Sequence, residues 1–129
     1  MTRHTSFAVL AAAAFAATAA NGCGAGQPIA AGTAPPGSTL RVGLVEWRIV
    51  TSSRAVTAGG DQITVTNTGT TGHDLHVTGP GVHAHTPTLP PGGTATLTIT
   101  TRAGTTLTLT CELPGHEAAG MHTTLAVRR

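Results

Sequence analysis

Three side chains near the C-terminal end of this 129-residue sequence are suited to binding a transition metal. Cys111, His116 and Met121 follow one another along the chain, with four residues between each member and the next. They offer a thiolate sulfur, an imidazole nitrogen and a weak thioether sulfur. Joined by a second imidazole, these donors form the ligand set of mononuclear blue-copper electron-transfer sites. The spacing therefore predicts a metal centre that lacks only one more histidine.

Short runs of alternating apolar residues begin at Thr39 and are separated by turns rich in Gly, Pro and Asn. Runs of this length and spacing are typical of a β-sandwich. The residues expected to face its core are Ile63, Val65, Leu75, Val77, Ala95, Leu97, Ile99, Leu107, Leu109, Leu125 and Val127. No helical periodicity is found outside the first 22 residues, so the sequence predicts an all-β fold.

The phase of each run indicates the direction of its polar residues, because alternate residues of a strand share one face. His73, Cys111 and Met121 each share the phase of the apolar residues in their own run. His76 and His122 take the opposite phase and are expected to point outward. Strand parity alone therefore selects His73 as the fourth ligand.

The first run changes phase partway along. Its apolar residues occupy even positions from Leu40 to Leu44 and odd positions from Val45 to Ile49. A glycine within a strand often marks a bulge or bend. We therefore expect Gly43 to bend one long strand so that it serves both sheets.

Over roughly residues 39–129 the sequence resembles the cupredoxin family of type 1 blue-copper proteins, the plastocyanin- and azurin-like group, in its bacterial secreted or lipoprotein form. The motifs that carry the resemblance are Cys-x4-His-x4-Met with its Pro-Gly-His and Gly-Met pairs, Glu46-Trp47, Ala58-Gly59, Thr-Val-Thr-Asn-Thr-Gly over 64–69, and His73-Asp74. The resemblance implies a Greek-key β-sandwich of about seven to eight strands. It also implies one copper ion bound by His73, Cys111 and His116 in a plane, with Met121 as a long axial ligand.

Asp74 stands where the family often has Asn, whose side chain bridges the two ligand loops and whose backbone N–H reaches the Cys sulfur. Parity places Asp74 outward beside His76, yet the resemblance implies that it supports the ligands without touching the metal. The alternative is a solvated Asp at a strand end. The resemblance further implies an electron exit at an exposed edge of His116, within an apolar patch of Leu113, Pro114, Ala118 and Ala119. Ordinary loop packing is the alternative for that patch.

Two further histidines, His83 and His85, lie in the Pro- and Gly-rich stretch 79–93 and are not part of the blue-copper pattern. Together with His76 or His122 they would form a second, weaker metal site. The alternative is that they are solvated loop residues.

Residues 1–22 have the short basic start and apolar stretch of a secretory signal. Cys23 follows Ala20-Asn21-Gly22 in a sequence similar to a bacterial lipoprotein box, which predicts lipid attachment at Cys23. Residues 23–38 are expected to form a flexible linker and residues 39–129 the folded domain. The alternative is cleavage after Ala17-Thr18-Ala19, which leaves Cys23 unpaired. We expect an extracytoplasmic protein, anchored to the outer face of the cell membrane as a lipoprotein.

The composition argues against other classes. A net charge of +2 without clustered basic residues gives no nucleic-acid footprint. An enzyme using Cys111 and His116 as nucleophile and base would need a third group to orient the His, and the sequence suggests none. A Cys23–Cys111 disulfide is a further alternative to a metal site. Trp47 is the only aromatic residue after position 15, so the core must be aliphatic.

These patterns and the resemblance favour a monomeric carrier of single electrons that uses one Cu(I)/Cu(II) ion and exchanges electrons with membrane-associated redox proteins. Two other functions stay open. A copper-binding or delivery protein would also use the additional histidines, and a metal-free β-sandwich would serve as an interaction domain.

Overall fold

The computed structural model describes residues 32–35 and 37–129. The predicted signal at 1–22 and the lipidation site Cys23 lie outside these residues. The described chain forms ten strands: β1 (Thr33–Ala34), β2 (Thr39–Val45), β3 (Arg48–Thr51), β4 (Ala55–Thr57), β5 (Gly59–Asn67), β6 (His76–Gly79), β7 (Val82–His85), β8 (Thr94–Thr101), β9 (Thr106–Thr110) and β10 (His122–Arg128). Over these same residues, no helix has the length and apolar character needed to cross a membrane.

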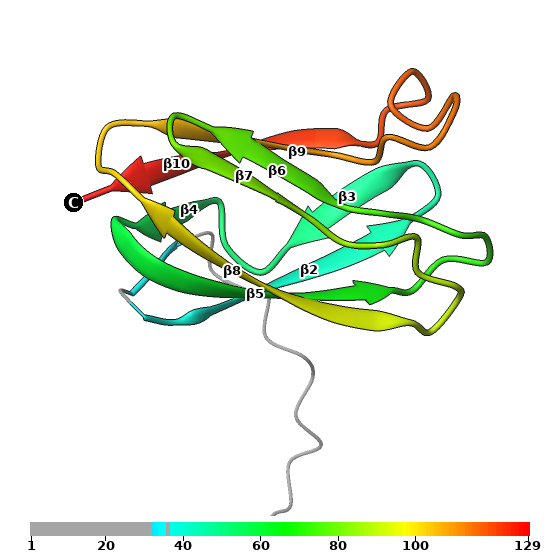
Figure 1. Ribbon diagram of the computed structural model, residues 1–129, viewed down its shortest axis with the longest axis horizontal. Coiled ribbons are helices and arrows are strands. Elements are labelled where there is room, and N and C mark those ends of the chain that lie inside the picture. The colour runs from blue at the N-terminus through cyan, green and yellow to red at the C-terminus, as the bar shows by residue number, and fades with distance from the viewer. Residues whose placement is uncertain (1–31, 36) are drawn as a thin grey trace, which may run out of the picture.

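The strands pack as two sheets, face to face (Figure 1). One sheet has six strands in the order β1-β4-β10-β9-β6-β7, and the other has four in the order β3-β2-β5-β8. Both are mixed, because β2 runs parallel to β5 and β4 runs parallel to β1 and β10. The predicted β-sandwich is confirmed, although the described part of the chain has ten strands rather than seven or eight.

The additional strands come partly from the first run, where our prediction of one bent strand is wrong. Gly43 pairs regularly with Val50, and β2 and β3 are antiparallel neighbours in the same sheet. The chain reverses between Val45 and Arg48, across a cis peptide bond between Glu46 and Trp47. The phase change therefore arises from a tight turn, and it leaves Trp47 48% exposed.

The sandwich also begins earlier than predicted. The two-residue strand β1 lies inside the range 23–38 that we assigned to a linker, and Thr33 and Ala34 pair with Ala55 and Val56 of β4. A stretch this short shows no alternation, so strand patterns in the sequence cannot reveal it.

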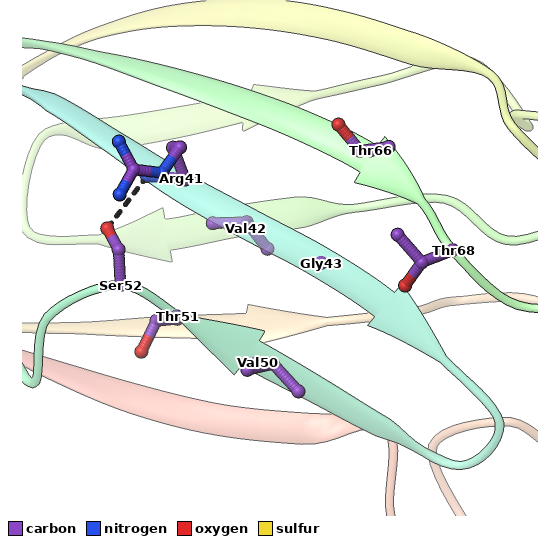
Figure 2. A pocket seen from close by; sticks show the side chains of 8 residues that line it. All are labelled: Arg41, Val42, Gly43, Val50, Thr51, Ser52, Thr66 and Thr68. Carbon is purple, nitrogen blue, oxygen red and sulfur yellow. Dashed lines mark hydrogen bonds between the residues drawn. The ribbon is translucent and has the colours of Figure 1, made fainter. Parts of the chain in front are cut away.

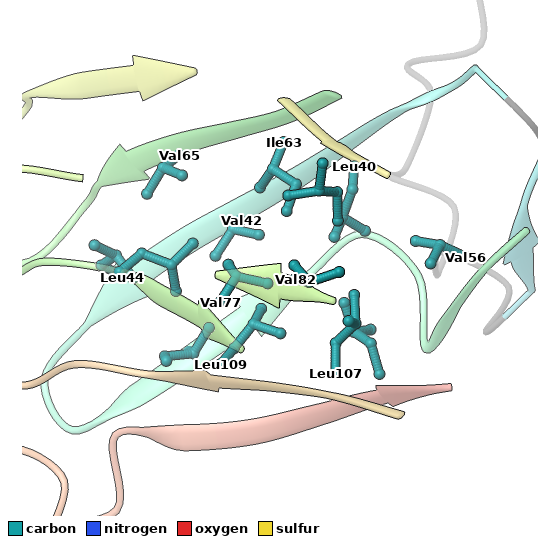
Figure 3. Packing of buried hydrophobic residues seen from close by; sticks show 14 of the residues in the cluster. Leu40, Val42, Leu44, Val56, Ile63, Val65, Val77, Val82, Leu107 and Leu109 are labelled. Atoms are coloured by element: carbon teal, nitrogen blue, oxygen red, sulfur yellow. The ribbon is translucent and has the colours of Figure 1, made fainter. Parts of the chain in front are cut away.

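The core between the sheets is aliphatic, as the composition predicts (Figure 3). Every residue that parity assigned to the core is buried, except that Ala95 and Leu97 are partly buried. The side chains of His73, Cys111 and Met121 have no exposed surface. The inward direction predicted for these three residues is therefore confirmed.

One acidic side chain departs from this apolar pattern. Asp61 points inward from β5, is 2% exposed, and neither of its carboxylate oxygens has a hydrogen-bond partner among the described residues. Desolvation by burial raises the pKa of Asp61 above its ordinary value. The folded protein therefore favours the protonated carboxyl and is destabilised when that group ionises.

Replacing Asp61 with Asn is expected to stabilise the protein at pH 7 by about 1–3 kcal/mol, because the amide avoids the cost of burying a charge. Folding raises the pKa of Asp61, so the Asn variant gains no stability over the parent at a pH below the ordinary pKa of 3.8. Its advantage grows as the pH rises through the pKa of the folded protein. Thermal melts from pH 3 to 8 check both the sign and the pH dependence. Glu117→Gln, which removes an exposed carboxylate, is the matched control. An Asn variant that is less stable than the parent at pH 7 contradicts the prediction.

Candidate metal centre

The predicted ligands gather at one end of the sandwich. Figure 1 shows the loop between β9 and β10 at the same end as the β2–β3 turn and the connection from β5 to β6, opposite the C-terminus. Two segments supply the predicted ligands: the connection before β6 carries His73, and the β9–β10 loop carries Cys111, His116 and Met121.

Backbone hydrogen bonds fix the segment that carries His73. Its N–H donates to the carbonyl of Leu89 (3.1 Å), and the N–H of Leu89 donates to the carbonyl of His73 (2.7 Å). The buried side chain of Asn67 braces the same region, because its Nδ2 donates to the carbonyls of Thr71 and Leu89. Its Oδ1 accepts the N–H of Gly69. The position of His73 is therefore determined by the fold.

The β9–β10 loop closes on itself. Cys111 N–H donates to the carbonyl of Met121 (3.0 Å), and Met121 N–H donates to the carbonyl of His116 (3.0 Å). The last residue before Met121 is Gly120, whose φ of 112° is in a region that favours glycine. A Cβ at Gly120 would also lie 3.2 Å from the carbonyl of Trp47. The spacing of the three predicted ligands thus corresponds to one compact loop.

Three of the four predicted ligands converge. Nδ1 of His73 lies 3.1 Å from Nδ1 of His116, and that nitrogen lies 3.4 Å from Sγ of Cys111. The three donor atoms all lie within 4.8 Å of one another. His73 and Cys111 are buried, whereas His116 is partly exposed. Two imidazoles and one thiol directed at a common point fit a soft transition metal such as copper.

The thiol of Cys111 is free, so the alternative of a disulfide with Cys23 is wrong. Burial raises the pKa of the Cys111 thiol above its ordinary value, while backbone N–H groups of Asp74 and Leu113 act in the opposite direction. Without a metal ion the thiol therefore stays protonated at neutral pH. Metal binding would release that proton and create the thiolate.

Met121 is in place next to this cluster. Its backbone is bonded to both Cys111 and His116, and its side chain is completely buried. The thioether belongs to the same core cluster as the thiol of Cys111. Its part as an axial ligand stays a prediction.

The outward position predicted for Asp74 is wrong. Asp74 is 7% exposed, and its Oδ1 accepts the N–H of Glu112 at 2.8 Å. Simple alternation fails here because Asp74 precedes β6 and is not part of a strand. Its carboxylate joins the two ligand-bearing segments, which is the contact that a supporting role requires. The effect of Asp74 on a bound metal stays a prediction.

Glu46 is a supporting residue that the sequence did not reveal. Its Oε1 accepts a hydrogen bond from Nε2 of His73 (3.2 Å) and bonds from the backbone N–H groups of Thr70 and Thr71 (2.6 and 2.9 Å). A Cβ at Gly69 would lie 2.6 Å from this oxygen, so only glycine admits so close an approach. With Nε2 held by Glu46, Nδ1 of His73 is the nitrogen directed at the cluster. The Glu46-Trp47 motif was the only signal in the sequence.

Trp47 covers part of His116. Their ring centroids are 5.0 Å apart at an interplanar angle of 87°. Pro114, Ala118 and Ala119 are exposed, and Leu113 is partly exposed. Trp47, which we had not assigned to this region, therefore contacts His116, while a continuous apolar surface formed by the loop residues stays a prediction.

A separate apolar hollow of about 310 Å³ lies on the outer face of the four-stranded sheet (Figure 2). Arg41, Val42, Gly43, Val50, Thr51, Ser52, Thr66 and Thr68 line it. The backbone N–H of Arg41 donates to Oγ of Ser52 (3.0 Å) at one side. None of the predicted metal ligands takes part in this hollow.

Comparisons with known proteins agree with this architecture. No protein-family model and no curated protein matches the sequence. Among solved structures, auracyanin from the photosynthetic bacterium Roseiflexus castenholzii is similar, with 22% identity, a TM-score of 0.58, and coverage of 72% of this chain and 98% of that one. Rusticyanin from Thiobacillus ferrooxidans gives 21% identity, a TM-score of 0.58, and coverage of 71% and 78%. A multicopper oxidase gives 22% identity and a TM-score of 0.52, over 69% of this chain but only 41% of that one.

These similarities, together with the sheet order, establish the fold. The chain has the cupredoxin fold, a β-sandwich in two mixed sheets. His73, Cys111 and His116 form a candidate type 1 copper site within it.

Proposed function

We propose that the protein is an extracytoplasmic type 1 copper protein that carries single electrons, with His73, Cys111, His116 and Met121 as its copper ligands. The observation that carries the proposal is the convergence of two imidazoles and one thiol within 4.8 Å. Two segments that are distant in the sequence supply these three side chains. Hydrogen bonds between protein groups alone hold both segments in position. A metal-free interaction domain would leave this arrangement unexplained.

Copper would supply the exchange of one electron between Cu(I) and Cu(II), and the chain supplies a fixed geometry for it. The bonds of Glu46 and Leu89 keep His73 from reorienting. Asp74 joins the two ligand-bearing segments, because its Oδ1 accepts the N–H of Glu112. A site that changes little between oxidation states suits a carrier better than a protein that must release its metal.

The partners that we propose are redox proteins associated with the membrane, which would bind at the partly exposed edge of His116. Support comes from Trp47, whose ring contacts that of His116, and from the exposed apolar residues Pro114 and Ala119 of the same ligand loop. Lipid attachment at Cys23 would keep the carrier at the outer face of the membrane. The match to a multicopper oxidase covers less than half of that protein, so no oxidase activity is proposed.

The test is to add one equivalent of Cu(II) to the purified protein and record its visible and EPR spectra. We expect an intense thiolate-to-copper charge-transfer band and a narrow copper hyperfine splitting, since Cys111 would be a direct ligand. Cys111→Ser should lose both, because a hydroxyl does not replace a thiolate donor.

Other outcomes separate the competing functions. A pale spectrum of tetragonal Cu(II) that is unchanged by Cys111→Ser would favour a copper-binding or delivery protein. The absence of stoichiometric binding would favour a metal-free interaction domain. Either result overturns the electron-carrier proposal.

A further inference from the structure

Three histidines that the candidate centre does not use lie together on the outer face of the six-stranded sheet. His76 of β6 is directly opposite His85 of the edge strand β7, and their rings are stacked with centroids 5.1 Å apart. The ring of His83 lies 6.1 Å from that of His85. His83 and His85 are exposed, so their imidazoles can rotate without disturbing the core.

Two carboxylates adjoin these rings. Oε1 of Glu112 lies 3.3 Å from Nδ1 of His76, and Oδ2 of Asp74 lies 3.8 Å from Nε2 of the same ring. Glu112 is exposed and can move with a ligand, whereas Asp74 is nearly buried. Three imidazole groups and at least one adjustable carboxylate are thus available within a small area.

The rest of this face has a different composition. In the register of the sheet, threonines take most of the other outward positions of β6, β9 and β10: Thr78, Thr106, Thr108, Thr110 and Thr124. Threonine suits an exposed strand position without further requirement. The histidines are therefore a local departure, concentrated at the β6–β7 edge, where cross-strand neighbours can share a ligand.

We propose that this cluster is a second metal site, which binds a divalent ion, Cu(II) or Zn(II), through the imidazoles of His76 and His85. His83 and Glu112 supply further donors after side-chain rotation. Imidazole and carboxylate donors suit these ions, and Cu(II) binds more tightly than Zn(II) to a given set of such ligands. The site has no thiolate, so it favours Cu(II) over Cu(I) and is chemically distinct from the Cys111 centre.

The experiment titrates Cu(II) into the purified full chain and follows EPR, visible absorption and binding stoichiometry. The parent protein is expected to bind two equivalents, one of which gives a pale tetragonal EPR signal. The double variant His83→Ala, His85→Ala should lose that signal and bind one equivalent, with the charge-transfer band unchanged. Cys111→Ser should show the reverse, losing the band and keeping the tetragonal signal.

His122→Ala is the matched control, because His122 is exposed on the same face but is separated from His76 by β9, at about 10 Å. This variant should still bind two equivalents, and thermal melts should show that all the variants are folded. A double variant that keeps the tetragonal signal, or a parent protein that shows no tetragonal signal, overturns the proposal. If no variant shows a charge-transfer band while the pale signal follows His83 and His85, the electron-carrier function fails and the second site stands.

Discussion

Glu46→Gln is expected to weaken copper binding about 10- to 100-fold, which is the usual cost of losing a residue that orients a metal-binding histidine. One carboxylate oxygen of Glu46 accepts bonds from Nε2 of His73 and from the N–H groups of Thr70 and Thr71. An amide at this position cannot receive all these donors with the strength of a charged acceptor. Competition titration with a chelator of known affinity measures the change.

The matched control for this variant is Glu117→Gln, which removes a carboxylate from the exposed part of the ligand loop. Its copper affinity should stay close to that of the parent. Equal losses in the two variants would indicate a general effect of charge and would contradict a specific role for Glu46.

The same contacts give Glu46 a signature in the metal-free protein. Its own backbone N–H and those of Thr71 and Thr70 lower the pKa of Glu46 from 4.5 to about 2. Because folding lowers the pKa of Glu46, its ionised carboxylate stabilises the fold at any pH above the ordinary pKa of 4.5. This stabilisation is lost as the pH falls toward 2. The difference in Tm between the parent and Glu46→Gln should therefore be constant near neutral pH and disappear in strong acid.

Replacing Met121 with Gln is expected to lower the reduction potential of the copper form by about 59 mV or more, equivalent to a tenfold change in the relative affinity for the two oxidation states. A thioether is a weak donor that favours Cu(I), whereas an amide oxygen is a harder donor that favours Cu(II). Redox titration of the visible band measures the change.

Met121→Leu separates the effect of ligation from that of packing. Leucine has a similar volume, so this variant should cost less than about 1.5 kcal/mol in the completely buried position of residue 121. It removes the axial donor and should raise the potential. If both variants leave the potential unchanged, Met121 is a core residue rather than a ligand.

Strand parity predicted the inward direction of Cys111 and Met121 because they adjoin β9 and β10, each of which has one buried face. It also predicted the direction of His73, which lies three residues before β6 and forms an isolated bridge with Leu89. The same method failed for Asp74, which precedes its strand, and for Gly43, where a phase change was interpreted as a bend. A tight turn of two residues and a β-bulge both shift the alternation of apolar residues by one position. The alternation in the sequence therefore cannot distinguish the turn between Val45 and Arg48 from a bulge.

The support given by Glu46 could not be predicted for a different reason. Glu46 lies in the β2–β3 turn and contacts residues 24 to 27 positions later in the sequence. No local pattern encodes such a contact, since it depends on how the turn and the segment before His73 meet at one end of the sandwich. Likewise, the pairing of His76 with His85 follows from the β6–β7 register.

The position of β1 has a consequence for how the protein would be oriented. β1 pairs with β4, and β4 pairs with the last residues of β10, whereas the ligand loop precedes the first residue of β10. A strand of that length spans about 20 Å, so β1 joins the sandwich at the end remote from the β9–β10 loop (Figure 1). If Cys23 carries a lipid, the exposed imidazole edge would lie at the end of the domain opposite the anchor. A membrane-associated redox partner would then reach it with a part that projects beyond the lipid headgroups.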